Sequence, residues 1–141
     1  MKAIVKFKKL HNDAKIPTMG YKGDACWDFY SVEDIIIPAR GSKEVNLGIA
    51  TEIPYGWEMV FRARSSYGRK GLQVHNGTID AGYRGYLGVF VYNHTNEDYE
   101  VKKGDKVVQA AVRQIPEVNF EEVQELTPSE RGEGAFGSSG R

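Results

Sequence analysis

The chain has 141 residues, and its 19 basic and 19 acidic side chains give a formal net charge of zero. This length suits one domain with a hydrophobic core and is short for two. The balanced charge gives no sign of a nucleic-acid or membrane partner held by bulk electrostatics. A single cysteine, Cys26, excludes an intramolecular disulfide, and the three scattered histidines lack the spacing of a metal site. No segment resembles a signal peptide or a membrane span, so we expect a cytoplasmic protein, or a nuclear or host-cell one if it is eukaryotic or viral.

Sixteen glycines and five prolines divide the chain into short segments. Short runs of β-branched and aromatic residues recur, whereas no window keeps a 3.6-residue apolar period. The pattern predicts an all-β barrel or sandwich with at most one short helix. The strands expected outside the central stretch are Ala3–Phe7, Ile35–Pro38, Lys43–Leu47, Ile49–Ile53, Trp57–Arg62, Tyr99–Val101 and Lys106–Ile115.

The central stretch, His75 to Asn93, contains two β-rich runs with a break at Ala81-Gly82 between them. Such runs around a glycine predict a hairpin. Asp80 ends the first run, a position where an aspartate often caps a turn with its own backbone. The same carboxylate also suits a rigid position above a pocket floored by Tyr83.

Asp28 lies between Trp27 and Phe29 in an expected strand, where aspartate is uncommon. The simplest explanation for an aspartate at this position is that the strand lies at the edge of a sheet or that the Asp28 side chain faces outward.

The segment from Arg62 to Leu72 places two arginines and two serines where a strand ends. A short helix beginning at Ser65 and Ser66 would present free backbone N–H groups, which bind phosphate oxygens together with hydroxyl and guanidinium groups. The alternative is an ordinary serine cap beside solvated arginines.

The last third of the chain contains one expected strand with an unusual polar residue, Gln109, among small apolar ones. We expect Val118–Leu126 to form an arm strand that packs on a neighbouring subunit. Residues 127–141 are rich in glycine and serine, with Phe136 standing alone, and composition alone predicts a disordered tail.

Taken together, five segments resemble the motifs of the trimeric dUTPases (deoxyuridine triphosphate nucleotidohydrolases), in family order and at similar spacing. They are Ala25–Tyr30, Arg62–Leu72 (an arginine, a serine and a short helix), Gly77–Asp80 with Tyr83–Gly85, Gly104–Gln109 and Arg131–Arg141. The resemblance implies a distorted jelly-roll-like β-barrel at residues 1–126 and a flexible C-terminal arm at residues 127–141 that closes over the site. It also implies a homotrimer with active sites between subunits.

The reaction implied is hydrolysis of dUTP to dUMP and pyrophosphate with Mg²⁺, which keeps uracil out of DNA and supplies dUMP for dTMP synthesis. Asp80 would activate the attacking water, and Asp28 would contact the metal through water or brace an arginine. The remaining implied substrate contacts are Arg64, Ser65, Ser66, Asn76, Gly77, Thr78, Ile79, Tyr83, Gln109, Arg131, Phe136, Gly137 and Ser138.

The chain departs from the family pattern at Ser66-Tyr67, where Gly-Leu is usual, and at Ala135, where glycine is usual. The segment from Arg64 to Leu72 also resembles the dCTP deaminases, some of which are bifunctional deaminase/dUTPases of a related fold. Those enzymes need a catalytic glutamate at a position that Phe90 occupies here. A non-catalytic nucleotide-sensing regulator is the second alternative, and the combined presence of four residues argues against it: Asp80, Ser65, Gln109 and Arg131.

Overall fold

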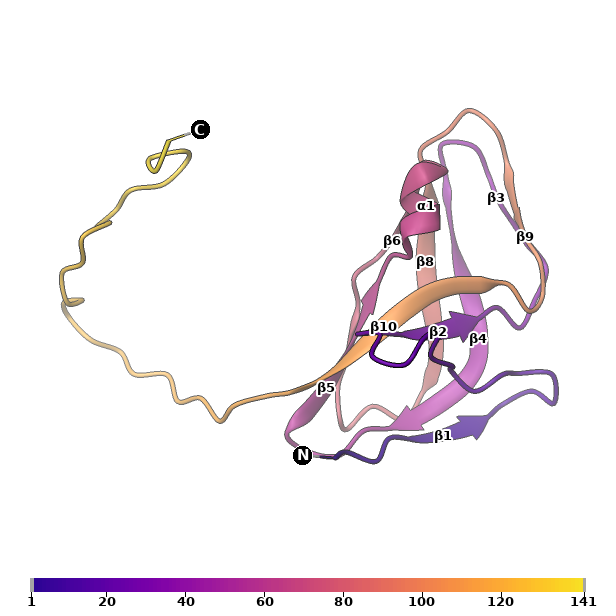
Figure 1. Ribbon diagram of the computed structural model, residues 1–141, viewed down its shortest axis with the longest axis horizontal. Coiled ribbons are helices and arrows are strands. Elements are labelled where there is room, and N and C mark those ends of the chain that lie inside the picture. Colours follow the sequence, from indigo (N-terminus) through magenta and orange to yellow (C-terminus); the bar gives the residue numbers. More distant parts are fainter. Residues whose placement is uncertain (1, 141) are drawn as a thin grey trace.

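A computed structural model describes residues 2–140, which form ten strands and one short helix (Figure 1). The elements are β1 (Lys6–Lys9), β2 (Trp27–Tyr30), β3 (Ile35–Ile37), β4 (Ser42–Glu52), β5 (Trp57–Arg62), α1 (Ser65–Arg69), β6 (Leu72–Val74), β7 (Thr78–Ile79), β8 (Tyr86–Asn93), β9 (Tyr99–Val101) and β10 (Lys106–Gln114). Within this part of the chain there is no helix with the length and apolar character that crossing a membrane requires.

The strands form two four-stranded sheets and one two-stranded sheet. One large sheet has the order β1-β4-β8-β6, the other has the order β2-β10-β5-β7, and β3 pairs with β9. The all-β prediction with one short helix is therefore confirmed, in a jelly-roll-like arrangement. The strand pairs found in residues 2–140 leave the sheets open rather than closing them into a barrel.

A cluster of aromatic rings joins the two large sheets. The ring of Phe29 on β2 packs edge-on against Phe7 of β1, with centroids 6.1 Å apart, and against Phe61 of β5 at 5.6 Å. Phe29 is only 1% exposed and belongs to a continuous apolar core. Because edge-to-face pairs add to the free energy of burial, this contact is a main link between the layers.

The predicted hairpin of the central stretch is wrong. Strand β7 pairs with β5 in one sheet, whereas β8 pairs with β4 and β6 in the other. The residues between them form a corner that we call the Asp80–Gly85 corner, closed by a hydrogen bond from the Tyr83 N–H to the Asp80 carbonyl at 3.1 Å. The β-rich composition of the two runs identified both strands, but local composition does not choose a strand's partner.

Two expected strand boundaries also differ. The first strand begins at Lys6 rather than Ala3, and β4 continues through Gly48, where a break was expected. Gly48 has φ +69°, and the register of β4 against β8 shifts between Asn46 and Ala50. A Cβ at Gly48 would lie 2.8 Å from the Val32 side chain. The glycine therefore produces a bulge inside one strand instead of ending it.

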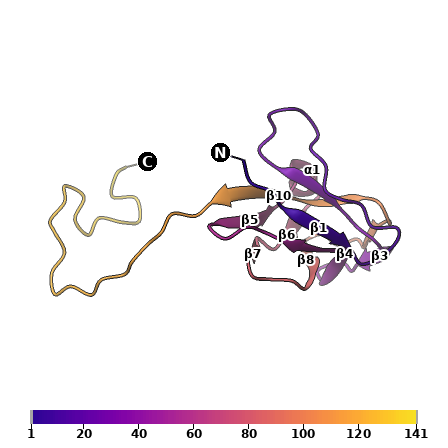
Figure 2. The same cartoon turned by 90° about the horizontal axis from the view of Figure 1, so that it is seen from below.

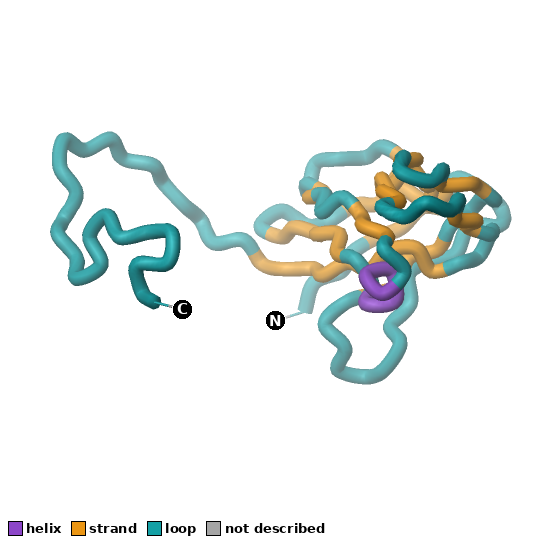
Figure 3. The backbone as a smooth tube through the Cα atoms, turned by 90° about the horizontal axis from the view of Figure 1, so that it is seen from above, coloured by secondary structure: helices purple, strands orange, loops and turns teal. Residues whose placement is uncertain are grey.

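Beyond β10 the chain leaves the body of the molecule as an arm, residues 115–140, without helix or strand (Figures 1 and 3). The arm strand expected at Val118–Leu126 is therefore not formed in this single chain. Phe120 and Leu126 are 98% and 87% exposed. These apolar side chains have no partner within their own chain that removes them from water.

We expect Phe29→Ala to lower the free energy of unfolding by about 3–5 kcal/mol, because it leaves a cavity between the sheets. Tyr55→Ala is the matched control, since Tyr55 is 88% exposed, and it should change stability by about 0.5 kcal/mol or less. Urea denaturation at a fixed protein concentration measures both. Equal losses in the two variants would contradict the role of Phe29.

Candidate active site

One group of predicted site residues gathers around the carboxylate of Asp28. Asp28 Oδ1 lies 3.2 Å from Arg64 Nε, and Oδ2 lies 3.5 Å from Lys106 Nζ. The Asp28 side chain is 15% exposed, so both pairs are partly shielded from water. Asp28 also faces Gln109 across the β2–β10 pair, and Gln109 Nε2 donates to the Ala63 carbonyl at 2.9 Å. The expected edge-strand position of Asp28 is correct, because β2 is an outer strand of its sheet.

Helix α1 follows this cluster directly and begins at Ser65. Arg64 precedes it in an extended conformation, with φ −77° and ψ 146°. The predicted helix at the serines is therefore present. Both serines sit in its first turn, next to the Asp28–Arg64 pair.

Tyr67, one of the departures from the family pattern, is a core residue. It is 3% exposed, and its ring packs edge-on against Tyr99 of β9, with centroids 5.9 Å apart. Burial raises the pKa of the Tyr67 hydroxyl well above its usual value, so the side chain stays neutral. Tyr67 thus fixes α1 to the body of the protein instead of covering the surface.

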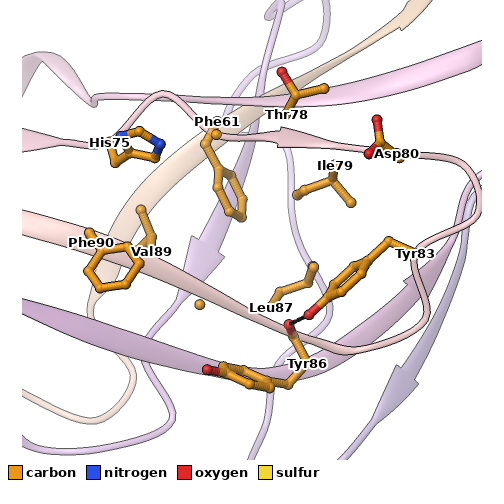
Figure 4. Close-up of a pocket in the computed structure, with 12 residues that line it drawn as sticks. Phe61, His75, Thr78, Ile79, Asp80, Tyr83, Tyr86, Leu87, Val89 and Phe90 are labelled. Carbon is orange, nitrogen blue, oxygen red and sulfur yellow. Dashed lines mark hydrogen bonds between the residues drawn. The ribbon is translucent and has the colours of Figure 1, made fainter.

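The second group lines a cavity of about 360 Å³ beside the Asp80–Gly85 corner (Figure 4). Gly77, Thr78, Ile79, Asp80 and Tyr83 from the predicted set line it, whereas Asn76 lies outside the lining. Asp80 is the one carboxylate among the lining residues and is exposed to solvent.

The rest of the cavity lining comes from β5, from β8 and from His75, and its residues were not among the site residues predicted from the sequence. They are Phe61, His75, Tyr86, Leu87, Gly88, Val89 and Phe90. Lys106, in the other group, was missed as well. The alternation of β8 was visible in the sequence, but only the fold shows which of its residues line the cavity beside Asp80.

Asp80 and Arg64 lie near opposite ends of β5. Ile79 faces Met59 and Thr78 faces Val60, so Asp80 lies level with Glu58 near the start of β5, whereas Arg64 follows its end. At about 3.3 Å per residue, roughly 20 Å of backbone separates Asp80 from Arg64. Figure 2 agrees, because α1 and β7 lie on opposite sides of the body.

The third predicted group lies on the arm. Arg131 Nε donates to the Gly134 carbonyl at 2.7 Å, which closes a tight turn. Phe136 is fully exposed, with φ 50°. Gly137 and Ser138 follow in the next turn, where the Ser138 N–H donates to the Ala135 carbonyl at 3.1 Å. The arm residues are thus remote from both other groups in this chain.

Comparison with known proteins decides the family. The family model described as dUTPase matches residues 12–140. The chain belongs to the dUTPase family. Membership makes it a dUTP diphosphatase, a hydrolase of nucleotide metabolism.

Relatives of this dUTPase span its whole length. A deoxyuridine 5'-triphosphate nucleotidohydrolase of Clostridioides difficile is 45% identical over 139 residues, covering 96% of this chain and 97% of the relative. One from Paramecium bursaria Chlorella virus 1 is 41% identical, covering 94% and 95%. The solved Staphylococcus bacteriophage 80alpha dUTPase with dUPNHPP superposes with a TM-score of 0.91 at 27% identity, covering 98% and 99%.

We expect Asp28→Asn to lower the free energy of unfolding by about 1 kcal/mol, because the amide loses charge attraction to Arg64 and Lys106. Asp34→Asn is the matched control, since Asp34 accepts a hydrogen bond from the Lys103 backbone N–H, which an amide oxygen also accepts. Denaturation at low and high salt measures the effect. The Asp28 difference should shrink with salt, and a salt-independent loss would contradict the ion-pair explanation.

Proposed function

We propose that this dUTPase hydrolyses dUTP to dUMP and pyrophosphate by attack of water on the α-phosphorus, with Asp80 as the base. The Asp80 carboxylate takes a proton from the water as its oxygen bonds to phosphorus. The bond from the α-phosphorus to the bridging oxygen breaks, and pyrophosphate leaves with the electron pair. The observation that carries this proposal is the position of Asp80 as the single carboxylate in the cavity lining.

Uracil would pair with the backbone of residues 77–83. Strand β7 is an outer strand of its sheet, bound to β5 along one edge. Its other edge has backbone groups that pair with no strand, and such an edge accepts an added partner. A base held edge-on against the backbone leaves no room for a 5-methyl group. Asn76 would contact the base or a water molecule from the rim.

Tyr83 would pack beneath the deoxyribose. Its ring lines the cavity and is 44% exposed, so one surface is free for a ligand. A ribose hydroxyl would meet this ring without a hydrogen-bond partner, and a desolvated, unpaired hydroxyl disfavours UTP.

The triphosphate would bind at the Asp28 cluster and α1. Gln109 uses one of its two amide protons on Ala63, which leaves the other for a phosphate oxygen. Ser65 and Ser66 offer hydroxyl groups beside the Arg64 charge, and Asp28 keeps the guanidinium in place. This combination of charge and fixed donors is well suited to an anion.

Magnesium fits this donor set. Among residues 2–140 no three His, Cys, Asp or Glu side chains are grouped to hold a metal ion. Mg²⁺ commonly keeps several waters and binds through substrate phosphates with one or two carboxylates. Asp28 is the carboxylate nearest the proposed phosphate contacts, and it would accept hydrogen bonds from metal-bound water. When bound, the ion neutralises phosphate charge.

The arm, residues 127–141, would close over the nucleotide. Phe136 is fully exposed and available to stack on uracil, and Arg131 would reach the γ-phosphate. Gly137 and Ser138 follow within reach of the same phosphates. Closure excludes water and orders the reacting groups.

We propose a homotrimer in which each site combines residues of different copies. The separation of roughly 20 Å between Asp80 and Arg64 along β5 in one chain supports shared sites, and the family resemblance implies three copies. The exposed apolar residues of the arm would pack on a neighbour. A suitable groove contains Trp27, Trp57 and Val112 beside β1, whose three lysines suit the glutamates at 117, 121 and 122.

A dCTP deaminase needs a catalytic carboxylate that this chain does not provide in the cavity wall. Phe90 lies in the cavity wall at the position where that glutamate is expected, and the other lining residues add no carboxylate besides Asp80. Proton transfer at a cytosine amino group would have no dedicated acid and base there.

For the cell, dUTP hydrolysis would keep uracil out of DNA and provide dUMP, in the cytoplasm or wherever DNA precursors are made.

We expect Asp80→Asn to lower kcat for dUTP by about 10²–10⁴-fold, the range typical for loss of a general base. Asp13→Asn is the control, because Asp13 is an exposed carboxylate paired with Lys103 on a distant loop. Product analysis with dUTP, dCTP, dTTP and UTP, each with Mg²⁺ or EDTA, tests the whole proposal. Deamination of dCTP, or turnover of dUTP by Asp80→Asn at the wild-type rate, would refute it.

Shared sites predict complementation between inactive variants. Asp80→Asn damages the cavity half of the site, and Gln109→Ala damages the phosphate half. Co-expressed copies should form mixed oligomers that contain some intact sites, so activity should reappear, whereas separately purified variants stay inactive. Sedimentation checks the oligomeric state. Mixed oligomers without activity would place both halves of each site in one chain.

A further inference from the structure

Tyr83 rests on a residue without a side chain. A Cβ atom added at Gly85 would lie 2.3 Å from the Tyr83 hydroxyl oxygen, 2.6 Å from Cζ and 2.9 Å from Cε1. All of these distances are far below van der Waals contact, so any side chain at Gly85 must displace the Tyr83 ring. The missing Cβ therefore allows the ring to lie against the backbone of the corner.

A single hydrogen bond holds the same, hydroxyl-bearing end of the ring. The Tyr83 hydroxyl donates to the Tyr86 carbonyl at 2.8 Å (Figure 4). The side chain of Tyr86 in turn donates to Glu44 Oε1 of β4 at 2.6 Å, and this bond raises the pKa of the Tyr86 hydroxyl. The Tyr83 ring is thus connected through Tyr86 to two strands of one sheet.

Core packing does not fix this ring, because Tyr83 is 44% exposed and lies on the Asp80–Gly85 corner rather than in a strand. The position of the ring is set by the space that Gly85 leaves and by the hydrogen bond to the Tyr86 carbonyl. The Tyr83 hydroxyl is already engaged in a protein hydrogen bond, so the ring face is the part left for a ligand.

We propose that Gly85 is a specificity-determining positioning residue, which sets how deeply the Tyr83 ring lies and so how much room remains beside the sugar C2′. The Tyr86 carbonyl acts with it by fixing the hydroxyl end of the ring. This inference rests on the proposed function, in which Tyr83 packs against the deoxyribose. Gly85 touches no substrate itself and acts through Tyr83.

The test replaces Gly85 by alanine and measures discrimination between deoxyribose and ribose. We expect Gly85→Ala to lower the ratio of kcat/KM for dUTP over UTP by about tenfold or more, the scale on which one misplaced methylene acts in a fitted pocket. Tyr83→Phe should also lower the ratio, because the ring loses its hydrogen bond. Gly20→Ala is the control with an unchanged ratio, since Gly20 lies on an exposed loop outside the proposed site and a Cβ there comes close only to the end of the Asp24 side chain, at 3.2 Å.

A double-mutant cycle separates positioning from a general structural effect. In a Tyr83→Leu background there is no tyrosine ring to displace, so adding Gly85→Ala should leave the ratio unchanged. An equal fall in both backgrounds, or an unchanged ratio in Gly85→Ala itself, would overturn the inference. Thermal unfolding of each variant confirms that the protein compared is folded.

Binding of dUMP and UMP, measured by titration calorimetry on the same variants, makes the test independent of turnover. If the wild type binds dUMP over UMP but hydrolyses no dUTP, the proposed reaction fails while the inference is still decided by the affinity ratio. A wild type that neither hydrolyses dUTP nor prefers dUMP overturns both.

Discussion

The position of β5 between β10 and β7 is the constraint on which the rest of the molecule depends. Pairing with β10 places Arg62 opposite Gln109, and pairing with β7 places Met59 opposite Ile79. A strand is stiff and rises by about 3.3 Å per residue, so its two ends cannot approach each other. Arg64 follows the end of β5 and Asp80 lies near its start, so the strand keeps the proposed base and the proposed phosphate contacts apart within one chain.

Positive charge is concentrated locally in this protein, although its net charge is zero. The chain is neutral as a whole, yet Arg64 and Lys106 meet within a few ångströms of the same Asp28 carboxylate. That carboxylate keeps two cations close together without substrate, where they would otherwise repel each other. In the proposed function, a triphosphate that enters beside α1 would meet donors that are already oriented, which would lower the entropy lost on binding.

The central stretch shows where reasoning from sequence stops. Its β-rich runs on either side of a glycine-containing break predict two strands, and both exist. Their pairing in different sheets was not predictable, because the alternation pattern specifies two faces of a strand but not which neighbour binds its edges. Tyr67 is similar, since its residue type fits a surface as well as a core, and only the packing against Tyr99 settles the choice.

By itself, the sequence determined the all-β class, the short helix at the serines and the family, and it proposed most side chains of the candidate site, because these depend on residue type, local period and motif spacing. The tertiary structure decided how those side chains are grouped. It separated Asp80 from Arg64, added Lys106, Phe61 and Phe90 to their surroundings, and seated Tyr83 on Gly85. Such groupings arise from long-range strand pairing and close packing, which bring together residues that no local pattern connects.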